Sequence, residues 1–478
     1  MSCIFFLTVL RFVQVSIPVS TQVDEWIAAE VLRDDFIHSQ TQLDATDDVA
    51  QSESPSQASV DLFTRFLAFI AQKVSDAPDS TKARISVLTS VLMHFVSSYL
   101  TDTDLFSFVN PFDTEVRTRV LAAYFIARAT LENHNIPDVP GTPPSALFTA
   151  AEDSEASIYA LFGGQGTNEV YFDELQALHD TYKPYVSDLI TSITNEILVP
   201  LVVSREACSF YNYGMDVASW LSGTSPRPPV AYLASIPVSL PLIGLTQLVQ
   251  YLVICRVSGF TPGELRDHIA GATGHSQGVV SAIAISASTS FESFDINAKK
   301  ALRWLFFCGM RGQEAFPVLA LEPGIVQDCV EGGEGEPTPM LSITNLSLAL
   351  LEPHVAATNK HLPVNAQIAV SLFNGPRSFV VTGPPRSLCG LVTNLRKVRA
   401  SPGVDQSKVP YSQRKPAFGM RFLVVNAPYH SAYLKGAAEK LCKEDLEGEE
   451  LWTTEELGIP VFNTEDGTRL FTLKCVSG

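Results

Sequence analysis

The sequence predicts an α/β fold in which a parallel sheet carries an inserted ferredoxin-like subdomain and follows a mostly helical N-terminal region. Three observations support this prediction. Strand and helix patterns alternate after residue 146, residues 338–425 change to a βαββαβ order, and residues 59–135 space their apolar side chains at a helical period. The 478 residues, 46% of them hydrophobic, suffice for a substantial core and for about two to four domains.

The N-terminal region, residues 1–145, is expected to be mostly helical. Its first apolar run, residues 3–10, lacks the basic flank and the cleavage site of a signal peptide, so we interpret it as a buried strand or an imperfect start of the reading frame. A helical pattern follows over residues 23–36. Residues 38–58 are rich in Ser, Gln, Asp and Thr, which predicts a flexible linker or surface loop before the helical bundle.

The second region, residues 146–478, begins after a proline-rich boundary. Its first strand is expected at residues 157–162, and a second strand leads into a glycine-rich turn at residue 274. The βαββαβ subdomain is expected to have strands at 339–344, 366–372, 378–382 and 421–425, with helices at 348–358 and 385–398.

Composition excludes several classes of function. The net charge is −18, from 33 basic and 51 acidic residues, and nucleic-acid binding would need a basic surface instead. No run approaches the roughly 18 apolar residues of a membrane span, so no membrane association is expected. The eight cysteines form neither a C-x-x-C motif nor a Cys/His cluster with zinc spacing. We therefore expect a reduced, cytoplasmic protein without a metal site.

The most informative motif is Gly-His-Ser-Gln-Gly at residues 274–278, which reads G-x-S-x-G between a short strand and an apolar helical run. Such a turn presents a serine hydroxyl at a helix N-terminus, where backbone N–H groups can stabilise an oxyanion. The glycines are expected because side chains would clash in so tight a bend. Ser276 is therefore the candidate nucleophile, although the motif alone also fits an ordinary strand–helix turn.

Nucleophilic catalysis by Ser276 would also need a base, and nine histidines are available. His430 follows the last strand of the βαββαβ subdomain, where it could face a cleft between the two subdomains. His275 adjoins Ser276 but should point away from the turn. On spacing alone, a surface or helix-capping role remains the better interpretation of His430, and no acidic triad partner is evident between Ser276 and His430.

Longer segments resemble the N-terminal region of the fungal type I fatty acid synthase β subunit, which holds the starter acetyltransferase domain of the malonyl/acyl-CoA:acyl-carrier-protein transacylase superfamily. The resemblance covers most of the chain. It rests on residues 158–166, 259–266, 271–278, 337–343, 374–376, 380–385 and 395–397. It implies a hydrolase-like acyltransferase core over residues 146–478, with the ferredoxin-like insertion at about 338–425.

By this resemblance, Ser276 is the nucleophile and His430, in a Pro-Tyr-His-Ser context, is the base. The backbone N–H groups of Gln165, in a Gly-Gln-Gly turn, and of Gln277, directly after the nucleophile, form the oxyanion hole. Only the backbone of Gln165 is implied in this role. Replacing its side chain should therefore harm activity less than loss of Ser276.

The resemblance also bears on the acyl group. Malonyl-selective relatives carry an arginine that pairs with the malonyl carboxylate, and the matching position here is Cys308. A small neutral side chain cannot pair a carboxylate bidentately, so an uncharged acyl group such as acetyl is expected. Two alternatives stay open: Cys308 is only a packed helix residue, or Arg311, one turn later, takes the arginine's place.

The implied activity is the starter step of fatty acid biosynthesis. An acetyl or short neutral acyl group passes from its substrate, acyl-CoA, to Ser276 and then to the phosphopantetheine thiol of an acyl carrier protein, with no bound cofactor or metal. The expected partners are this carrier protein, the synthase α subunit and other β-subunit regions. The acyl chain length, and the choice between primary fatty acids and a polyketide starter, stay open.

Two alternatives to this activity remain. In the family the acyltransferase domain continues further, so the chain is expected to be truncated at its C-terminus or degenerate. The second possibility is therefore a catalytically incomplete piece of the synthase with a structural or partner-binding role. The G-x-S-x-G turn also occurs in lipases and thioesterases, so a serine hydrolase is the third possibility.

Overall fold

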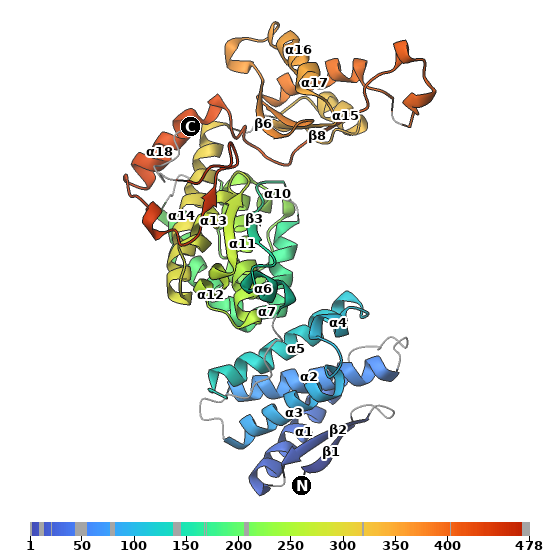
Figure 1. Cartoon of the computed structure of the whole chain (residues 1–478), viewed down its shortest axis with the longest axis vertical. Coiled ribbons are helices and arrows are strands. Elements are labelled where there is room, and N and C mark those ends of the chain that lie inside the picture. Colours follow the sequence, from blue (N-terminus) through green and yellow to red (C-terminus); the bar gives the residue numbers. More distant parts are fainter. Residues whose placement is uncertain are drawn as a thin grey trace. The chain divides into compact units, whose positions relative to one another are not determined.

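The structure is a computed structural model that describes residues 2–8, 14–20, 22–43, 55–76, 82–136, 145–166, 168, 170–204, 210–317, 320–401 and 403–470 (Figure 1). The chain divides into two compact units. The first comprises Met1–Asp153, Glu174–Leu189 and Val249–Thr261, and the second comprises Ser154–Asp173, Ile190–Leu248 and Pro262–Gly478. This division differs from a single boundary at residue 145, because the long helices α7 (Tyr171–Ile193) and α11 (Ile236–Ser258) each contribute to both units.

The first unit contains a β-hairpin and a helical bundle. Strand β1 (Ser2–Thr8) pairs antiparallel with β2 (Gln14–Ser20). Phe63, Phe66 and Phe95, which follow the helical period of the sequence, are fully buried, so the predicted bundle is present. Its helices are α1 (Val23–Leu43), α2 (Pro55–Ser75), α3 (Lys82–Tyr99), α4 (Leu105–Val109), α5 (Thr114–Asn133) and α6 (Ala146–Glu152).

The predicted linker over residues 38–58 is wrong at both ends. Helix α1 continues to Leu43 and α2 begins at Pro55. Residues 44–54 lie outside the described part of the chain. The helical ends have a simple cause, because Gln and Leu are good helix formers and proline is favoured in the first helical turn.

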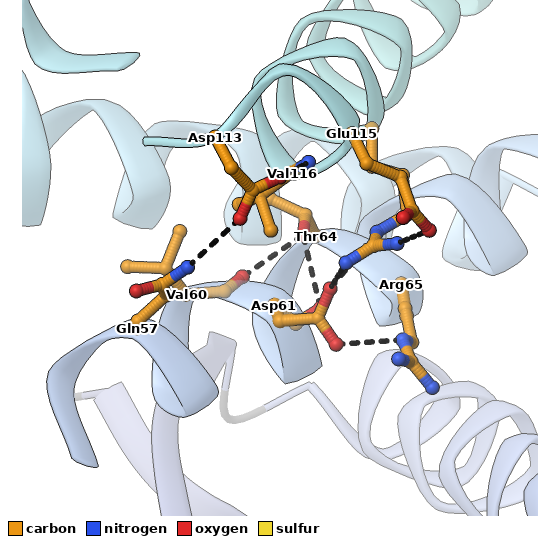
Figure 2. A network of polar contacts seen from close by, with 9 residues as sticks. Gln57, Val60, Asp61, Thr64, Arg65, Asp113, Glu115 and Val116 are labelled. Carbon is orange, nitrogen blue, oxygen red and sulfur yellow. Dashed lines mark hydrogen bonds and ion pairs between the residues drawn. The ribbon is translucent and has the colours of Figure 1, made fainter. Parts of the chain in front are cut away.

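A polar network joins α2 to α5 in this unit (Figure 2). Asp61 is buried, and its carboxylate accepts from Arg65 Nε at 2.7 Å and from Arg119 at 3.0 Å. At the start of α5, the Asp113 side chain caps the helix by accepting from the Val116 N–H at 2.9 Å. The ion pair of Asp61 with Arg119, together with a hydrogen bond between the Ser75 and Thr130 hydroxyls at 3.2 Å, joins α2 to α5.

The second unit is built on the predicted parallel sheet, with strand order β3-β4-β9. Strand β4 (Ile269–Gly274) lies at its centre and pairs in parallel with β3 (Ile158–Phe162) and β9 (Val461–Phe462). The helices of this part, besides α11, are α8 (Val199–Ser204), α9 (Val217–Leu221), α10 (Val230–Leu233), α12 (Pro262–Asp267), α13 (Gly278–Ser286), α14 (Phe291–Ala315) and α18 (Lys435–Lys440).

The predicted ferredoxin-like subdomain is also present. Its four antiparallel strands have the order β6-β7-β5-β8, which is the order of a βαββαβ unit with the first and third strands at the centre. Its core includes the fully buried Leu341, Val381 and Leu388. The elements are α15 (Pro323–Glu331), β5 (Met340–Thr344), α16 (Leu348–Asn359), β6 (Ala369–Gly375), β7 (Ser378–Thr382), α17 (Pro385–Val398) and β8 (Gly419–Phe422).

Two helical stretches in the described part of the chain are long and apolar enough to cross a membrane, although the sequence predicted none. They are Tyr171–Val203 and Ile236–Ser258, with mean hydropathies of 1.5 and 1.7. Of the Ile236–Ser258 window 89% is buried inside the protein, as in the core helix of a soluble protein, whereas the share for Tyr171–Val203 is 33%. Length and composition alone are weak evidence for a membrane span.

Among the described cysteines, Cys442 differs from expectation. Cys255, Cys308, Cys329 and Cys389 are free thiols, but Cys442 is disulfide-bonded. The expectation of reduced cysteines throughout is therefore wrong at Cys442, because cysteine pairing cannot be deduced from scattered positions in a sequence.

Candidate functional site

Ser276 lies in the sharp turn between β4 and α13. Its φ angle is 53°, in the left-handed region that few residues other than glycine adopt. A Cβ atom on Gly274 would lie 1.9 Å from the carbonyl carbon of Gly278, and one on Gly278 would lie 2.4 Å from the Phe162 oxygen. Both glycines are thus required by close backbone approach, and the turn holds the serine at the N-terminus of α13.

The structure brings His430 to Ser276 across 154 positions of sequence. Ser276 Oγ and His430 Nε2 are 2.8 Å apart, within hydrogen-bond distance. His430 also has a positive φ angle, 59°, in the segment after β8. Its ring retains solvent exposure, yet burial by the surrounding protein, followed by the charge of nearby His275, lowers the pKa of the imidazole below its ordinary value of 6.5. A lowered pKa keeps His430 neutral, and therefore able to accept a proton, at neutral pH.

His275 is turned to a different partner, as the sequence suggested. Its Nε2 lies 3.1 Å from Oδ1 of Asn374, at the end of β6 in the ferredoxin-like subdomain. The nucleophile turn and the subdomain hairpin therefore touch through this pair. Within the described residues, no carboxylate forms a hydrogen bond with His430, so an acidic triad partner is absent there.

The two backbone N–H groups named in the sequence analysis, of Gln165 and Gln277, lie on the turns that meet at Ser276. In the described part of the chain, neither the Gln165 nor the Gln277 N–H donates a hydrogen bond. The turn that carries Gln165 lies against the nucleophile, since a Cβ on Gly164 would be 3.1 Å from Ser276 Cβ. This arrangement has the components of an oxyanion hole.

Cys308 and Arg311, both on α14, have different environments. Cys308 is half-buried, burial raises the pKa of its thiol to about 12, and its carbonyl accepts from the hydroxyl of Tyr429, the neighbour of His430, at 3.2 Å. Cys308 is thus neutral and adjoins the segment that carries the base. Arg311 instead forms a bidentate ion pair with buried Asp445 at 2.8 and 3.0 Å. Its guanidinium is therefore already paired with carboxylates of the protein.

Sequence reasoning missed a set of buried polar side chains beneath the turn, namely Asn168, Ser239, Gln247 and Ser281. Polar residues within apolar helices were the available signal, since Ser239 and Gln247 interrupt the apolar α11. In the described part of the chain, no group of three or more His, Cys, Asp or Glu side chains is placed to hold a metal ion.

A serine at a strand–helix turn, paired with an imidazole and flanked by two N–H groups without a partner among the described residues, is typical of sites in which a serine accepts an acyl group. The chain belongs to the family described as starter unit:ACP transacylase in aflatoxin biosynthesis, whose model matches residues 160–416. A second model, described as the N-terminal domain in fatty acid synthase subunit beta, matches residues 8–131. The resemblance noted in the sequence is thereby confirmed.

Full-length relatives support the same family. The chain is 38% identical to fatty acid synthase subunit beta of Saccharomyces cerevisiae over 433 residues, which is 90% of this chain and 21% of the relative. It is 36% identical to the Schizosaccharomyces pombe subunit, over 96% of this chain and 21% of the relative. The fatty acid synthase beta subunit TOXC of Cochliobolus carbonum is 35% identical over 86% of this chain and 20% of the relative. The chain thus spans about a fifth of the length of these relatives.

Among solved structures, the chain is similar to a type II polyketide malonyl-transacylase in complex with its acyl-carrier protein. The TM-score is 0.44 and the identity 18%, over 66% of this chain and 77% of that one. It is also similar to a loading acyltransferase from the avermectin modular polyketide synthase. The TM-score is 0.41 and the identity 19%, over 67% of this chain and 77% of that one.

Proposed function

We propose that this chain transfers an acetyl or other short neutral acyl group from CoA to the phosphopantetheine thiol of an acyl carrier protein. The observation that carries the proposal is the 2.8 Å contact between Ser276 Oγ and His430 Nε2 in a strained turn, beside two N–H groups that have no partner among the described residues. Membership of the transacylase family supports it. The α subunit of a fatty acid synthase and other β-subunit regions are proposed partners, because the relatives are synthase β subunits.

The chemistry takes two acyl transfers through one serine. His430 accepts the Ser276 proton as Oγ attacks the thioester carbonyl, and the N–H groups of Gln165 and Gln277 stabilise the tetrahedral oxyanion. The C–S bond breaks, CoA takes the proton from His430, and an acyl-serine remains. The phosphopantetheine thiol then gives its proton to His430 and attacks the ester. The Ser276 alkoxide leaves and recovers the proton.

The preference for a neutral acyl group rests on α14. Cys308 carries no charge, and Arg311 is bound to Asp445, so neither residue offers a cation to a malonyl carboxylate. This pairing disfavours the alternative in which Arg311 takes the place of the family arginine. A carboxylate carried into the site would lose its hydration without a partner.

The test of the proposal is a mass-spectrometric assay with acetyl-CoA and a holo acyl carrier protein. Acetylated carrier protein is the expected product. Free acetate without acetyl-carrier would favour a serine hydrolase, and no turnover at all would favour a structural or partner-binding role. Each alternative would overturn the transferase proposal.

Changing the charge at Cys308 should change the acyl preference. A Cys308→Arg variant places a cation on α14, and a charge-assisted hydrogen bond contributes about 1.5–3 kcal/mol. The ratio of kcat/KM for malonyl-CoA over acetyl-CoA should therefore rise at least about tenfold, with Cys308→Ser as the neutral control. A wild-type preference for malonyl-CoA would contradict the neutral-acyl assignment.

The pH profile should report the environment of His430. Because the pKa of His430 is lowered, its ring stays neutral down to a lower pH than a free imidazole would. The apparent pKa at which kcat/KM falls on the acid side should therefore lie below 6.5, and activity should be lost as the pH drops through it. In a His275→Gln variant one cause of the lowering is removed, so this apparent pKa should rise, while burial still holds it below 6.5. An unchanged or lower apparent pKa would contradict this electrostatic account.

A further inference from the structure

The two residues that flank the proposed oxyanion hole are joined to each other through their side chains. Gln165 Nε2 donates to Gln277 Oε1 at 2.6 Å, although the residues are 112 positions apart. Gln277 is buried, and its Nε2 donates in turn to the Leu240 carbonyl on α11 at 3.2 Å. The Gly-Gln-Gly turn and the nucleophile turn are thus tied together beneath the site.

The side-chain oxygen of Gln165 also has hydrogen-bond partners. Its Oε1 accepts from Asn168 Nδ2 and from Ser239 Oγ, the latter at 3.2 Å. Asn168 and Ser239 are both fully buried. Asn168 Oδ1 also accepts from the Gly166 N–H at 3.0 Å, so the backbone directly after Gln165 is held by the same side chain.

These bonds allow only one orientation of the two glutamines. The Gly166 N–H fixes Asn168 Oδ1 as oxygen, so Asn168 Nδ2 is a donor. Its partner on Gln165 is therefore Oε1, which leaves Nε2 to face Gln277. The Leu240 carbonyl likewise fixes Gln277 Nε2, which leaves Oε1 to face Gln165. Rotating either amide would bring like groups together inside the protein and leave buried polar groups unsatisfied, which is unfavourable.

A second anchor holds the same turn from its start. Gln247, on α11, donates through Nε2 to the Gly163 carbonyl at 2.8 Å. Its Oε1 accepts from Ser281 Oγ, on α13, at 2.7 Å. The turn is therefore fixed at both ends by buried side chains, and one of these anchors reaches the helix that follows the nucleophile.

We propose that the side chains of Gln165 and Gln277 act as a clamp, which sets the separation of their own backbone N–H groups and so shapes the oxyanion hole. Both are positioning residues through their side chains, in addition to any role of their N–H groups. This inference rests on the proposed function. It revises the expectation that only the backbone of Gln165 matters.

The clamp predicts which kinetic constant changes. The N–H groups bind the oxyanion in the tetrahedral state, so loosening them should lower kcat and leave KM for acyl-CoA largely unchanged. A misplacement of about 1 Å can cost about 100-fold in rate. We expect losses of about 10- to 100-fold in kcat for Gln165→Met and for Gln277→Met, with KM altered less than about threefold.

The experiment compares these two variants with the double variant and with a matched control, all in the full chain. The control is Asn297→Leu, which removes a buried amide that bonds to Ser288 and Trp452. Each protein is tested for acylation by acetyl-CoA and by p-nitrophenyl acetate, an activated ester that needs no CoA recognition. Unfolding midpoints in urea are measured alongside, since every substitution leaves buried partners unsatisfied.

A clamp requires that the double variant falls no further in kcat than either single one, while Asn297→Leu keeps wild-type kcat despite a similar loss of stability. Single variants with wild-type kcat, multiplicative losses in the double variant, or an equal loss in the control would overturn the clamp. A wild-type chain that reacts with the ester but not with acetyl-CoA would overturn the proposed function instead, and the clamp would then be judged on the ester. A wild-type chain inert to both would overturn both.

Discussion

A Ser276→Ala variant should lose acyl transfer almost completely. Removing the nucleophile of a serine–histidine site can cost about 10⁶-fold in kcat, because no acyl-enzyme forms and only binding and the oxyanion hole remain. The measurement is the mass of the intact protein after mixing with acetyl-CoA, which should rise by one acetyl group in the wild type and stay unchanged in the variant. Ser187→Ala, which alters a serine bonded to its own helix at Lys183, should label normally.

The effects of replacing Ser276 and His430 should not add up. Because Ser276 and His430 act on the same proton at 2.8 Å, replacing both should cost little more than replacing either one. Additive losses in Ser276→Ala, His430→Ala and the double variant would show that the two residues act independently. Labelling that persists in Ser276→Ala would assign the nucleophile to another residue.

Stability separates loss of chemistry from loss of fold. A residue with a side chain at a φ of 53° carries strain of about 1–3 kcal/mol, which glycine avoids. Ser276→Gly should therefore be as inactive as Ser276→Ala. Relief of backbone strain stabilises the folded variant, whereas the added flexibility of glycine stabilises its unfolded chain. The net result should be a free energy of unfolding higher than that of the wild type by up to about 1 kcal/mol. Inactivity together with undiminished stability can only reflect the missing hydroxyl.

The local parts of this site could be predicted from sequence, because local geometry leaves a local pattern. Gly274 and Gly278 mark a backbone contact that excludes side chains, so the turn around Ser276 could be located from five residues. His430 has no such geometric pattern, and it was predicted as the base only from the resemblance of its Pro-Tyr-His-Ser context. Only the fold, which returns the chain from the ferredoxin-like subdomain to the parallel sheet, brings its ring to the serine.

The network beneath the turn was out of reach for the same reason. Ser239 and Gln247 interrupt an apolar helix, yet a polar residue on such a helix fits either a solvent-facing stripe or a buried bond. Their partners at Gln165 and Gly163 are more than 70 positions away. Composition also gave a wrong prediction at the end of α1. The polar residues there suggested a linker, but the helix continues to Leu43.

The second large effect is expected at Glu334, a fully buried carboxylate in the ferredoxin-like subdomain. It accepts from Arg396 at 2.5 and 3.2 Å and from Arg399 at 3.3 Å, and the bond to Glu334 is the main cause of the raised pKa of Arg396. Breaking a buried ion pair by removing one partner costs about 3–5 kcal/mol, because the remaining charge stays buried. Glu334→Leu should lie at the low end of this range, about 3 kcal/mol, since both arginines are partly exposed and Arg396 keeps a second partner in Asp328.

Asp328 supplies the matched control, because its exposed carboxylate pairs with the same Arg396 at 2.8 Å. Asp328→Leu should cost less than about 1 kcal/mol, as surface ion pairs do. Urea unfolding of the full chain, followed by hydrogen exchange at the amides of α17 and β8, measures both variants. Equal costs would mean that burial does not decide the strength of these pairs.

The position of Glu334 connects this stability to the site. Its carbonyl accepts from the Phe422 N–H at 2.8 Å, at the end of β8, and the chain reaches His430 eight residues later. Loosening that strand end should therefore weaken the hold on His430 as well. We expect Glu334→Gln, which keeps one acceptor oxygen, to fold with an intermediate loss of stability and to label Ser276 more slowly than Asp328→Leu. Wild-type labelling in Glu334→Gln, despite faster exchange in β8, would show that His430 is held by other contacts.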